Sequence, residues 1–454
     1  MRCLLRLVRT ALLCFLALVG LVSCGGDSGA GSSGVSAPGG FVEKAGSAIR
    51  TRWTSEEIQS FIPAGRDKFV FPAPYQTEAV RITTASDCNG SDCVWPVAYS
   101  YWRNMNNHVG SDHMLIFLGT DRSRGGQGPM LFRYDKATDQ VSNLGPLFDS
   151  ASALSWANGS GWYFSASLPT ALYLNDGPRM VRYDVMNRTA EVVFDLTAQF
   201  GADRQVAQMY SSNDDQVHSA TLRAASSGED LGCVVYFEST RQFRFVPKIG
   251  DFDECQVDKS GRYLMTFEQI DGRNGIDNRI FDLQDGTEER VLNLPNAAAV
   301  GHHDFGYGYV VGHDNFNPLP NATLTRSLDA SLTKGPVDHR DYNWELGQVQ
   351  HISHTNAKPG IPKEQQYACG SNADRVMYAQ NEIICFPLDG SLDQLVVAPV
   401  MTSLDASGGG DDYAKAPKGN LDVTGQYFIW STNLGGNRSD AFVVKVPAQL
   451  LNRG

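Results

Sequence analysis

The segment DKSGRYLM at Asp258–Met265 decides the fold, because its pattern recurs along the chain. It begins with an aspartate, turns at a glycine and continues as an apolar strand, and DVTGQYFI at Asp422–Ile429 repeats it closely. Glycine, aspartate, asparagine and serine suit such turns because they tolerate positive φ or bond to the local backbone. Looser copies begin near Gly110, Asn158, Ser212, Asp304 and His351, so the sequence predicts seven repeats.

A hairpin of two short strands follows most of these units, at a repeat spacing of roughly 45 to 70 residues. The hairpins are expected at residues 131–135 with 140–144, 180–184 with 190–194, 233–236 with 243–245, 279–281 with 290–292, and 383–386 with 395–397. Four strands in each of seven repeats predict an all-β, seven-bladed propeller of four-stranded antiparallel blades. The alternative is a pair of β-sandwiches or an irregular all-β fold.

The last repeat predicts how the ring closes. Residues 441–446 form its third strand and the sequence ends soon afterwards, so an outermost strand is missing. Residues 78–83, which precede the first repeat, are apolar enough to fill this place. We therefore expect an N-terminal strand to pair with the last blade and remove two open edges.

Composition limits the class of protein. The 454 residues are 42% apolar and 19% charged, enough for a large core and unlike a disordered chain. The formal charge of −12 argues against nucleic acid as a partner, and any acidic substrate needs a local cluster of Arg or Lys.

The N-terminus has the pattern of a bacterial export signal. Arg2, Arg6 and Arg9 precede an apolar run over residues 11–22, too short for a comfortable membrane span. The ending LVSC, at residues 21–24, resembles the lipobox of bacterial lipoproteins. The resemblance implies cleavage before Cys24, lipidation of its thiol and a cell-envelope location, at the periplasmic or surface side of the outer membrane. An ordinary secretory signal with a chance cysteine is the alternative.

The expected organisation follows from these features. Residues 1–23 are the signal peptide, 24–40 a lipidated Gly/Ser tether, 41–83 an N-terminal segment with the closing strand, 84–447 the propeller and 448–454 a tail. The protein is expected to be a monomer that contacts the membrane only through its anchor.

Six cysteines remain after Cys3, Cys14 and Cys24, and they fall into three local pairs. An even number at short range suits disulfides in an oxidising compartment. The expected pairs are Cys88 with Cys93, Cys233 with Cys255, and Cys369 with Cys385, the last bridging neighbouring strands of the sixth blade. A zinc site at Cys88 and Cys93 is the alternative, but no second Cys/His pair lies nearby in the sequence.

The turn phrase and the blade length resemble the periplasmic propellers of the TolB type. They also resemble oligogalacturonate lyases and the propeller-shaped ulvan lyases. The similarity covers most of residues 84–447. It implies a propeller fold, and the two lyase families imply action on an acidic polysaccharide, but a fold alone does not fix function.

Histidines concentrate where the first strand of a blade meets the channel. His108 precedes the first turn, His302 and His303 take the equivalent place in the fifth repeat, and His351 and His354 lie there in the sixth. Five of the nine histidines fall in this zone. Two chemistries would explain this convergence.

The first chemistry is a metal site, because imidazole suits several divalent metals. The spacing Gln348-x-x-His351, with His302 or His303 one blade earlier, resembles the metal-binding pattern of oligogalacturonate lyases. The resemblance implies one divalent ion (Mn, Ca or Zn) held by His302, Gln348, His351 and His354. The pattern departs from that family at Ser353, where a second His is expected, and at Val257, the nearest match to its catalytic base.

The second chemistry is β-elimination on a uronate without a catalytic metal. It needs a cation to neutralise the carboxylate, a base for the α-proton and an acid for the leaving oxygen. The candidates for base and acid are His108, His303, Tyr307 and His351. Arg103 or Arg223 would pair the carboxylate, and Trp102 would stack on a sugar ring. This arrangement resembles the His/Tyr/Arg sites of ulvan lyases in kind.

The sequence therefore leaves three functions open. The first is an envelope-tethered lyase or related enzyme acting on a uronate polysaccharide, which requires His108, His303 and His351 to meet in one cleft with an arginine. The second is a non-catalytic lipoprotein whose propeller is a binding or assembly platform. The third is a propeller with a structural metal ion. The absence of Gly-x-Ser-x-Gly, His-Glu-x-x-His and dinucleotide-binding motifs disfavours a fused serine hydrolase, a zinc protease and a dehydrogenase.

Overall fold

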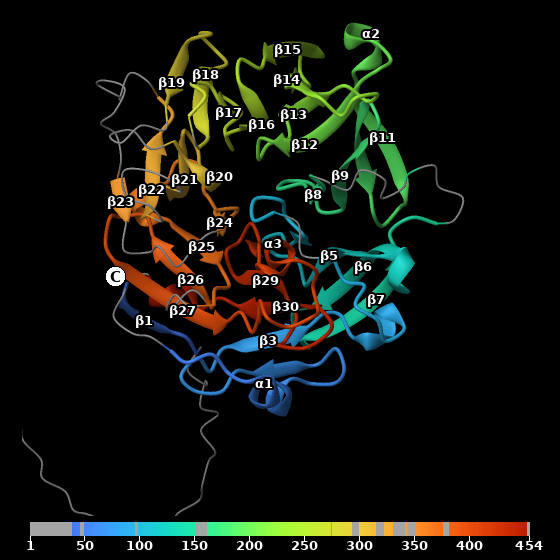
Figure 1. Ribbon diagram of the computed structural model, residues 1–454, viewed down its shortest axis with the longest axis vertical. Coiled ribbons are helices and arrows are strands. Elements are labelled where there is room, and N and C mark those ends of the chain that lie inside the picture. Colours follow the sequence, from blue (N-terminus) through green and yellow to red (C-terminus); the bar gives the residue numbers. More distant parts are fainter. Residues whose placement is uncertain are drawn as a thin grey trace, which may run out of the picture. The chain divides into compact units, whose positions relative to one another are not determined.

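Seven antiparallel sheets follow one another along the chain and form the blades of a propeller (Figure 1). The computed structural model describes residues 39–451, apart from 46–49, 96–98, 150–153, 155–160, 274, 293–298, 315–321, 330–340, 344–350 and 376–380. The predicted signal peptide, Cys24 and most of the predicted tether thus lie outside the described residues, as does Gln348. No helix of the described part of the chain is long and apolar enough to cross a membrane.

Each blade contains four strands in sequence order, and the first three blades are regular. Their strands are β4 (Met105–Asn106), β5 (His113–Thr120), β6 (Gly128–Asp135) and β7 (Gln140–Pro146); β8 (Tyr163–Phe164), β9 (Ala171–Asp176), β10 (Arg179–Asp184) and β11 (Thr189–Asp195); and β12 (Gln205–Ser211), β13 (Val217–Arg223), β14 (Asp230–Phe237) and β15 (Gln242–Pro247). The helix α2 (Thr197–Phe200) connects the second and third blades.

The next three blades repeat the order. Their strands are β16 (Asp251–Val257), β17 (Tyr263–Gln269), β18 (Asp277–Asp282) and β19 (Glu288–Val291); β20 (Gly301–Phe305), β21 (Tyr309–Asp314), β22 (Ala322–Ser327) and β23 (Asp341–Asn343); and β24 (His351–Ser353), β25 (Tyr367–Ser371), β26 (Glu382–Pro387) and β27 (Asp393–Pro399). β1 (Phe41–Lys44) adds a fifth strand outside β27, which the sequence did not predict.

The N-terminal segment closes the ring as predicted. The seventh blade contains β28 (Asn420–Leu421), β29 (Tyr427–Thr432) and β30 (Asp440–Lys445), and β3 (Glu78–Arg81) pairs with β30 as its fourth strand. β2 (Lys68–Val70) pairs with the other edge of β3 and is the outermost strand of this sheet. The Arg81 guanidinium donates to the buried Asp440 carboxylate at 2.5 Å, and the Thr83 hydroxyl donates to the same carboxylate at 2.9 Å. This polar contact fixes the first and last segments of the propeller to each other.

The aspartate at the head of the two closest copies of the phrase forms its turn. The Asp258 carboxylate accepts backbone N–H bonds from Arg262 at 3.1 Å and Tyr263 at 3.0 Å, and Asp422 accepts one from Tyr427 at 2.7 Å. Gly261, at φ +72°, completes the turn in a conformation that suits glycine. The phrase therefore joins the first and second strands of a blade.

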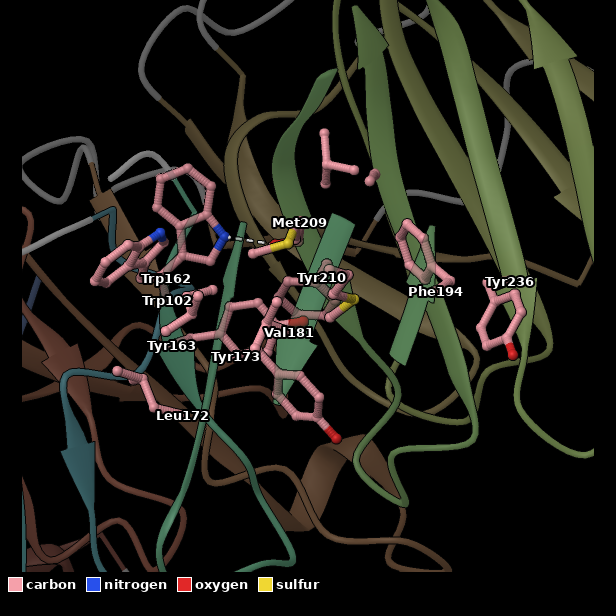
Figure 2. Close-up of a cluster of buried hydrophobic side chains, with 14 of the residues drawn as sticks. Trp102, Trp162, Tyr163, Leu172, Tyr173, Val181, Phe194, Met209, Tyr210 and Tyr236 are labelled. Atoms are coloured by element: carbon pink, nitrogen blue, oxygen red, sulfur yellow. Dashed lines mark hydrogen bonds between the residues drawn. The ribbon is translucent and has the colours of Figure 1, made fainter. Parts of the chain in front are cut away.

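All three predicted disulfides are confirmed. Cys88–Cys93 closes a loop before the first blade, and Cys369–Cys385 joins paired residues of β25 and β26. Cys233–Cys255 joins β14 to β16, so it crosslinks the third and fourth blades. The core fills the space between blades, and Figure 2 shows one such cluster, which includes Tyr163 and Tyr210.

Replacing Arg81 with methionine tests the closure. The variant leaves the Asp440 carboxylate buried with only Arg438 as a cationic partner, so we expect the free energy of unfolding to fall by ~3 kcal/mol. The measurement is urea denaturation. Arg262→Met, which removes a half-exposed partner of Asp282, is the control and should cost less than ~1 kcal/mol. Equal losses in the two variants would contradict a special role for this pair.

Candidate functional site

A short segment lies across the axis of the propeller. This axial segment, residues 99–104, precedes β4 and contacts the first strands of the six other blades. The contacts are Arg103 Nε to Phe164 O (2.7 Å), Trp102 Nε1 to Met209 O (2.9 Å), Tyr101 hydroxyl to Glu254 (2.5 Å), Tyr101 ring to His303 (5.4 Å), Tyr99 ring to His351 (5.2 Å) and Asn420 Nδ2 to Asn104 Oδ1 (3.0 Å). Side chains of this segment therefore fill the centre of the ring.

The axial position changes the interpretation of two predicted substrate-binding residues. Trp102 is only 7% exposed and its indole N–H is bonded to Met209, as the dashed line in Figure 2 shows. Arg103 is 1% exposed, and its guanidinium lies against the Tyr163 ring at 5.4 Å. Neither side chain is available to a sugar at the surface, because the segment that carries them is packed inside the ring.

The first strands of the third, fourth and fifth blades share a β-bulge near their starts. The register shifts between Ala207 and Tyr210 in β12, between Phe252 and Glu254 in β16, and between Gly301 and Asp304 in β20. His302 has a φ of 43°, which is uncommon for a residue with a side chain. Bulges redirect side chains and occur often beside functional sites.

The bulge in β20 sends its two histidines into different surroundings. The His303 ring stacks on Phe267 at 4.1 Å and on Tyr101. The His302 ring stacks instead on His351 of the sixth blade, at 4.4 Å. His302 of the fifth blade and His351 of the sixth blade are therefore in contact.

Further polar and aromatic side chains surround this histidine pair. The Tyr99 and Tyr413 rings both pack on His351, and Lys418 lies over the Tyr413 ring at 3.9 Å. Tyr413 belongs to α3 (Asp412–Lys415), which precedes the seventh blade. We call this set the mouth cluster, and its members are Tyr99, Tyr101, Glu254, His302, His303, His351, Tyr413 and Lys418. It lies where the first strands begin, at the strand-start end of the propeller.

Burial sets the protonation states of the cluster. Burial, followed by the charge of His302, lowers the pKa of His303 and of His351 well below the usual range, so both imidazoles are neutral. Burial, followed by the charge of Asp253, raises the pKa of Glu254 to about 8, and burial lowers the pKa of Lys418 to about 8. At neutral pH the cluster thus holds proton acceptors, a protonated carboxyl group and an ammonium group.

The other predicted catalytic residues lie at the opposite, turn end. His108 follows β4, and its Nε2 contacts the Asn106 side chain; burial, followed by the charge of Arg103, lowers its pKa. The Tyr307 hydroxyl accepts a bond from Asn213 Nδ2 at 3.1 Å, within the turn after β20. The structure therefore divides the predicted set, because His302 and His351 begin their strands whereas His108 and Tyr307 follow theirs.

The predicted metal ligands are divided in the same way. The Nε2 of His354 accepts from the Tyr309 hydroxyl at 2.6 Å, and its Nδ1 donates to the Tyr367 carbonyl at 3.0 Å, so both nitrogens are engaged. Within the described ranges, no three His, Cys, Asp or Glu side chains are grouped so that they could hold a metal ion. The described residues thus do not fit the predicted metal site.

Arg223 ends β13 and pairs with Gln205, the first residue of β12, so it lies at the strand-start end. Its guanidinium is bidentate to the Asp230 carboxylate, at 2.6 and 3.2 Å. A substrate carboxylate would have to replace Asp230 to bind there.

A buried ion pair separates the two ends. Lys259 Nζ lies 2.7 Å from Asp304 Oδ1, and both side chains are fully buried. The same carboxylate accepts from the Tyr210 hydroxyl at 3.0 Å and from the His354 backbone N–H at 2.6 Å. Asp304, which follows His303 in β20, thus holds three polar partners in the interior.

Several members of the cluster carry no local sequence signal. Glu254 and Lys418 sit in no motif, and Tyr413 belongs to a one-turn helix between two blades. The spacing Tyr99-x-Tyr101 indicates no site by itself, because only the position of the axial segment brings these rings to His351 and His303. Sequence analysis could have identified His313, because it lies in the strand that pairs with β20, opposite Gly301. Its ring lies 6.4 Å from the His302 ring.

Comparisons with known proteins support the fold. No protein-family model matches the sequence, and no curated protein matches it. An oligogalacturonate lyase from Vibrio parahaemolyticus has a similar structure, with a TM-score of 0.60 at 9% identity over 86% of this chain and 98% of that one. An oligogalacturonate lyase in complex with manganese gives a TM-score of 0.57 at 13% identity, with the same coverage. TolB from Acinetobacter baumannii also matches, at a TM-score of 0.36 and 12% identity over 68% of this chain and 64% of TolB. At these identities the likeness to the two lyases establishes the propeller fold alone.

The raised pKa of Glu254 predicts that the free energy of unfolding depends on pH. Its pKa is about 8 in the folded protein and 4.5 ordinarily, so between these values the folded state holds a proton that the unfolded state has lost. Stability from this group is complete below pH ~4.5 and is lost as pH rises, by up to ~1.4 kcal/mol for each pH unit. We expect Glu254→Gln to flatten this decline in urea denaturation measured from pH 5 to pH 9. Parallel curves for the two proteins would refute the buried protonated carboxyl group.

Proposed function

We propose that this protein acts on a uronate-containing polysaccharide by β-elimination, with the mouth cluster as its active site. The observation that carries the proposal is the juxtaposition of the neutral imidazoles of His303 and His351 with Lys418 and a protonated Glu254 at one end of the propeller. The likeness to oligogalacturonate lyases supports it at the level of fold.

The reaction needs three groups. A base takes the proton on the carbon next to the carboxylate, the electron pair forms a carbon–carbon double bond, and the bond to the leaving glycosidic oxygen breaks while an acid protonates that oxygen. A cation beside the carboxylate makes the proton more acidic. No oxidant or water is consumed.

The cluster offers a residue for each role. His351 supplies the proton acceptor, because burial holds its imidazole neutral. His302 stacks on His351 from the more exposed side of the pair. Glu254 donates the proton to the leaving oxygen, and Tyr101 holds that carboxyl group in place. Lys418, in its ammonium form, offsets the substrate carboxylate. No step runs through a metal ion.

The proposal includes a location and a partner. We propose that the protein is held in the bacterial envelope through lipidated Cys24, at the periplasmic or surface side of the outer membrane, and the lipobox-like LVSC at residues 21–24 supports this location. Its partner is an acidic polysaccharide or oligosaccharide, bound by a monomer.

A second function is favoured by one observation. Glu254, His303 and His351 are at most 8% exposed behind Tyr99 and Tyr101, as expected for packing residues. If these groups never meet a substrate, the protein is a non-catalytic envelope lipoprotein whose propeller binds other molecules.

The decisive experiment follows the ultraviolet absorbance of the double bond that β-elimination creates. Purified protein is added to pectin, ulvan, alginate and glycosaminoglycans, with and without chelator and with added Mn²⁺. We expect product from one polymer class and a loss of about 100-fold or more in kcat for His351→Ala, since positioned proton transfer contributes on this scale.

His218→Ala is the matched control, because His218 is buried in β13 and bonded to Ser211 and Glu238. It should leave kcat unchanged if the protein folds. A flat trace with every polymer would favour the binding-platform function, and a chelator effect would restore a metal to the mechanism.

The pH profile gives an independent test. Glu254 must be protonated and Lys418 cationic, and the pKa of each is about 8. We therefore expect kcat/KM to fall above pH ~8, since each group loses its active form there. Glu254→Gln should remove most of the activity at every pH. A rate that keeps rising to pH 10 would show that neither group has this role.

A further inference from the structure

A polar cavity lies away from the mouth cluster, between the N-terminal segment and the outer part of the sixth blade. Its volume is about 440 Å³, and its walls come from residues 50–55, from the ends of β26 and β27, and from residues 401–405. Glu382 begins β26 and Pro399 ends β27, so the cavity lies at the strand-start end, like the mouth cluster. The proposed reaction uses none of these residues.

Three arginines face the cavity. Arg50, Arg52 and Arg375 line it, against the carboxylates of Glu382 and Asp405. Arg375 is paired with Asp405 at 2.7 Å and with Asp412 at 2.6 Å, so its charge is balanced. Arg50 is held by Glu382 at 2.5 Å and by Glu43 at 2.6 Å, so its charge is balanced.

Arg52 is the guanidinium whose charge is not balanced. It donates to the backbone carbonyls of Asp374 at 2.8 Å and Arg375 at 2.9 Å, and it is exposed. Among the residues that the structure describes, it has no acidic partner within ion-pair distance. The two carbonyl bonds fix the orientation of the fork, and a fixed guanidinium fork suits a carboxylate.

Aromatic and hydroxyl groups complete the cavity. The Trp53 ring packs edge-on against Phe61 at 5.1 Å and Tyr75 at 5.5 Å, which holds it in one orientation. Thr51, Thr54 and Ser403 add hydroxyl groups to the wall. A rigid aromatic ring beside hydrogen-bonding groups and a cation is a combination that suits an acidic sugar.

The cavity is also connected to the mouth cluster. Arg375 pairs with Asp412 at 2.6 Å, and the next residue, Tyr413, packs on His351. Arg375 thus joins the wall of the cavity to α3, which carries part of the cluster. A polymer long enough to occupy both places would run along one end of the propeller.

We propose that this cavity is an accessory binding site for the uronate of an acidic oligosaccharide, with Arg52 pairing its carboxylate and Trp53 contacting its ring. The inference rests on the proposed substrate class. It assigns binding of a distal sugar unit to the cavity and leaves the bond cleavage at the mouth cluster.

The test compares binding and cleavage in the same proteins. Titration calorimetry with defined oligogalacturonides and oligoglucuronides measures binding to His351→Ala, to His351→Ala with Arg52→Gln, and to His351→Ala with Trp53→Ala. We expect each cavity substitution to weaken binding by about tenfold, the scale of one fixed ionic or ring contact. Arg290→Gln, on the outer strand of the fourth blade, removes the same charge elsewhere and should leave affinity unchanged.

The outcomes separate the two proposals. Equal affinity in the Arg52→Gln and reference proteins, or equal losses in Arg52→Gln and Arg290→Gln, would overturn the accessory site whether or not the protein is a lyase. Binding that depends on Arg52 and Trp53, without any elimination product from the protein that keeps His351, would support the accessory site and refute the lyase. A thermal melt of every variant confirms that each one folds.

Discussion

The axial segment at residues 99–104 is the constraint on which the rest of the structure depends. A seven-bladed ring leaves space at its centre, and polar strand ends left there without partners would be costly. Here one segment contacts the first strand of every other blade, with Tyr101 bonded to Glu254 and Trp102 to Met209. It therefore fixes the blades relative to one another and also decides which side chains can face solvent.

The same segment creates the unusual chemistry of the strand-start end. Tyr99 and Tyr101 cover His351, His303 and Glu254, so water is largely removed from these groups. Removing water disfavours charge, which keeps the imidazoles neutral and Glu254 protonated. Catalytic acids and bases need such shifted pKa values, but buried structural groups show them as well. Access of a substrate past Tyr99 and Tyr413 is therefore the property that separates an enzyme from a binding platform.

The sequence predicted repeats and local pairs more successfully than the site. The Asp–turn–Gly phrase is local, because the carboxylate of Asp258 bonds to backbone groups only four and five residues away. The three disulfides join residues close in sequence, and the closing strand followed from one missing position in a repeat. The histidines were harder to place: alignment on the turns put His108 beside His302, although one follows its strand and the other begins its strand.

The sequence by itself determined the number of blades, the closure and the disulfides. The blades and the closure depend on short-range hydrogen bonds and a repeated apolar pattern, and the disulfides join cysteines that are close in sequence. The tertiary structure alone decided which polar groups meet. Trp102 and Arg103 became interior residues because the axial segment turns into the ring. Glu254 and Lys418 joined the histidines from blades far apart in sequence, and both pKa values depend on burial, which no stretch of sequence encodes.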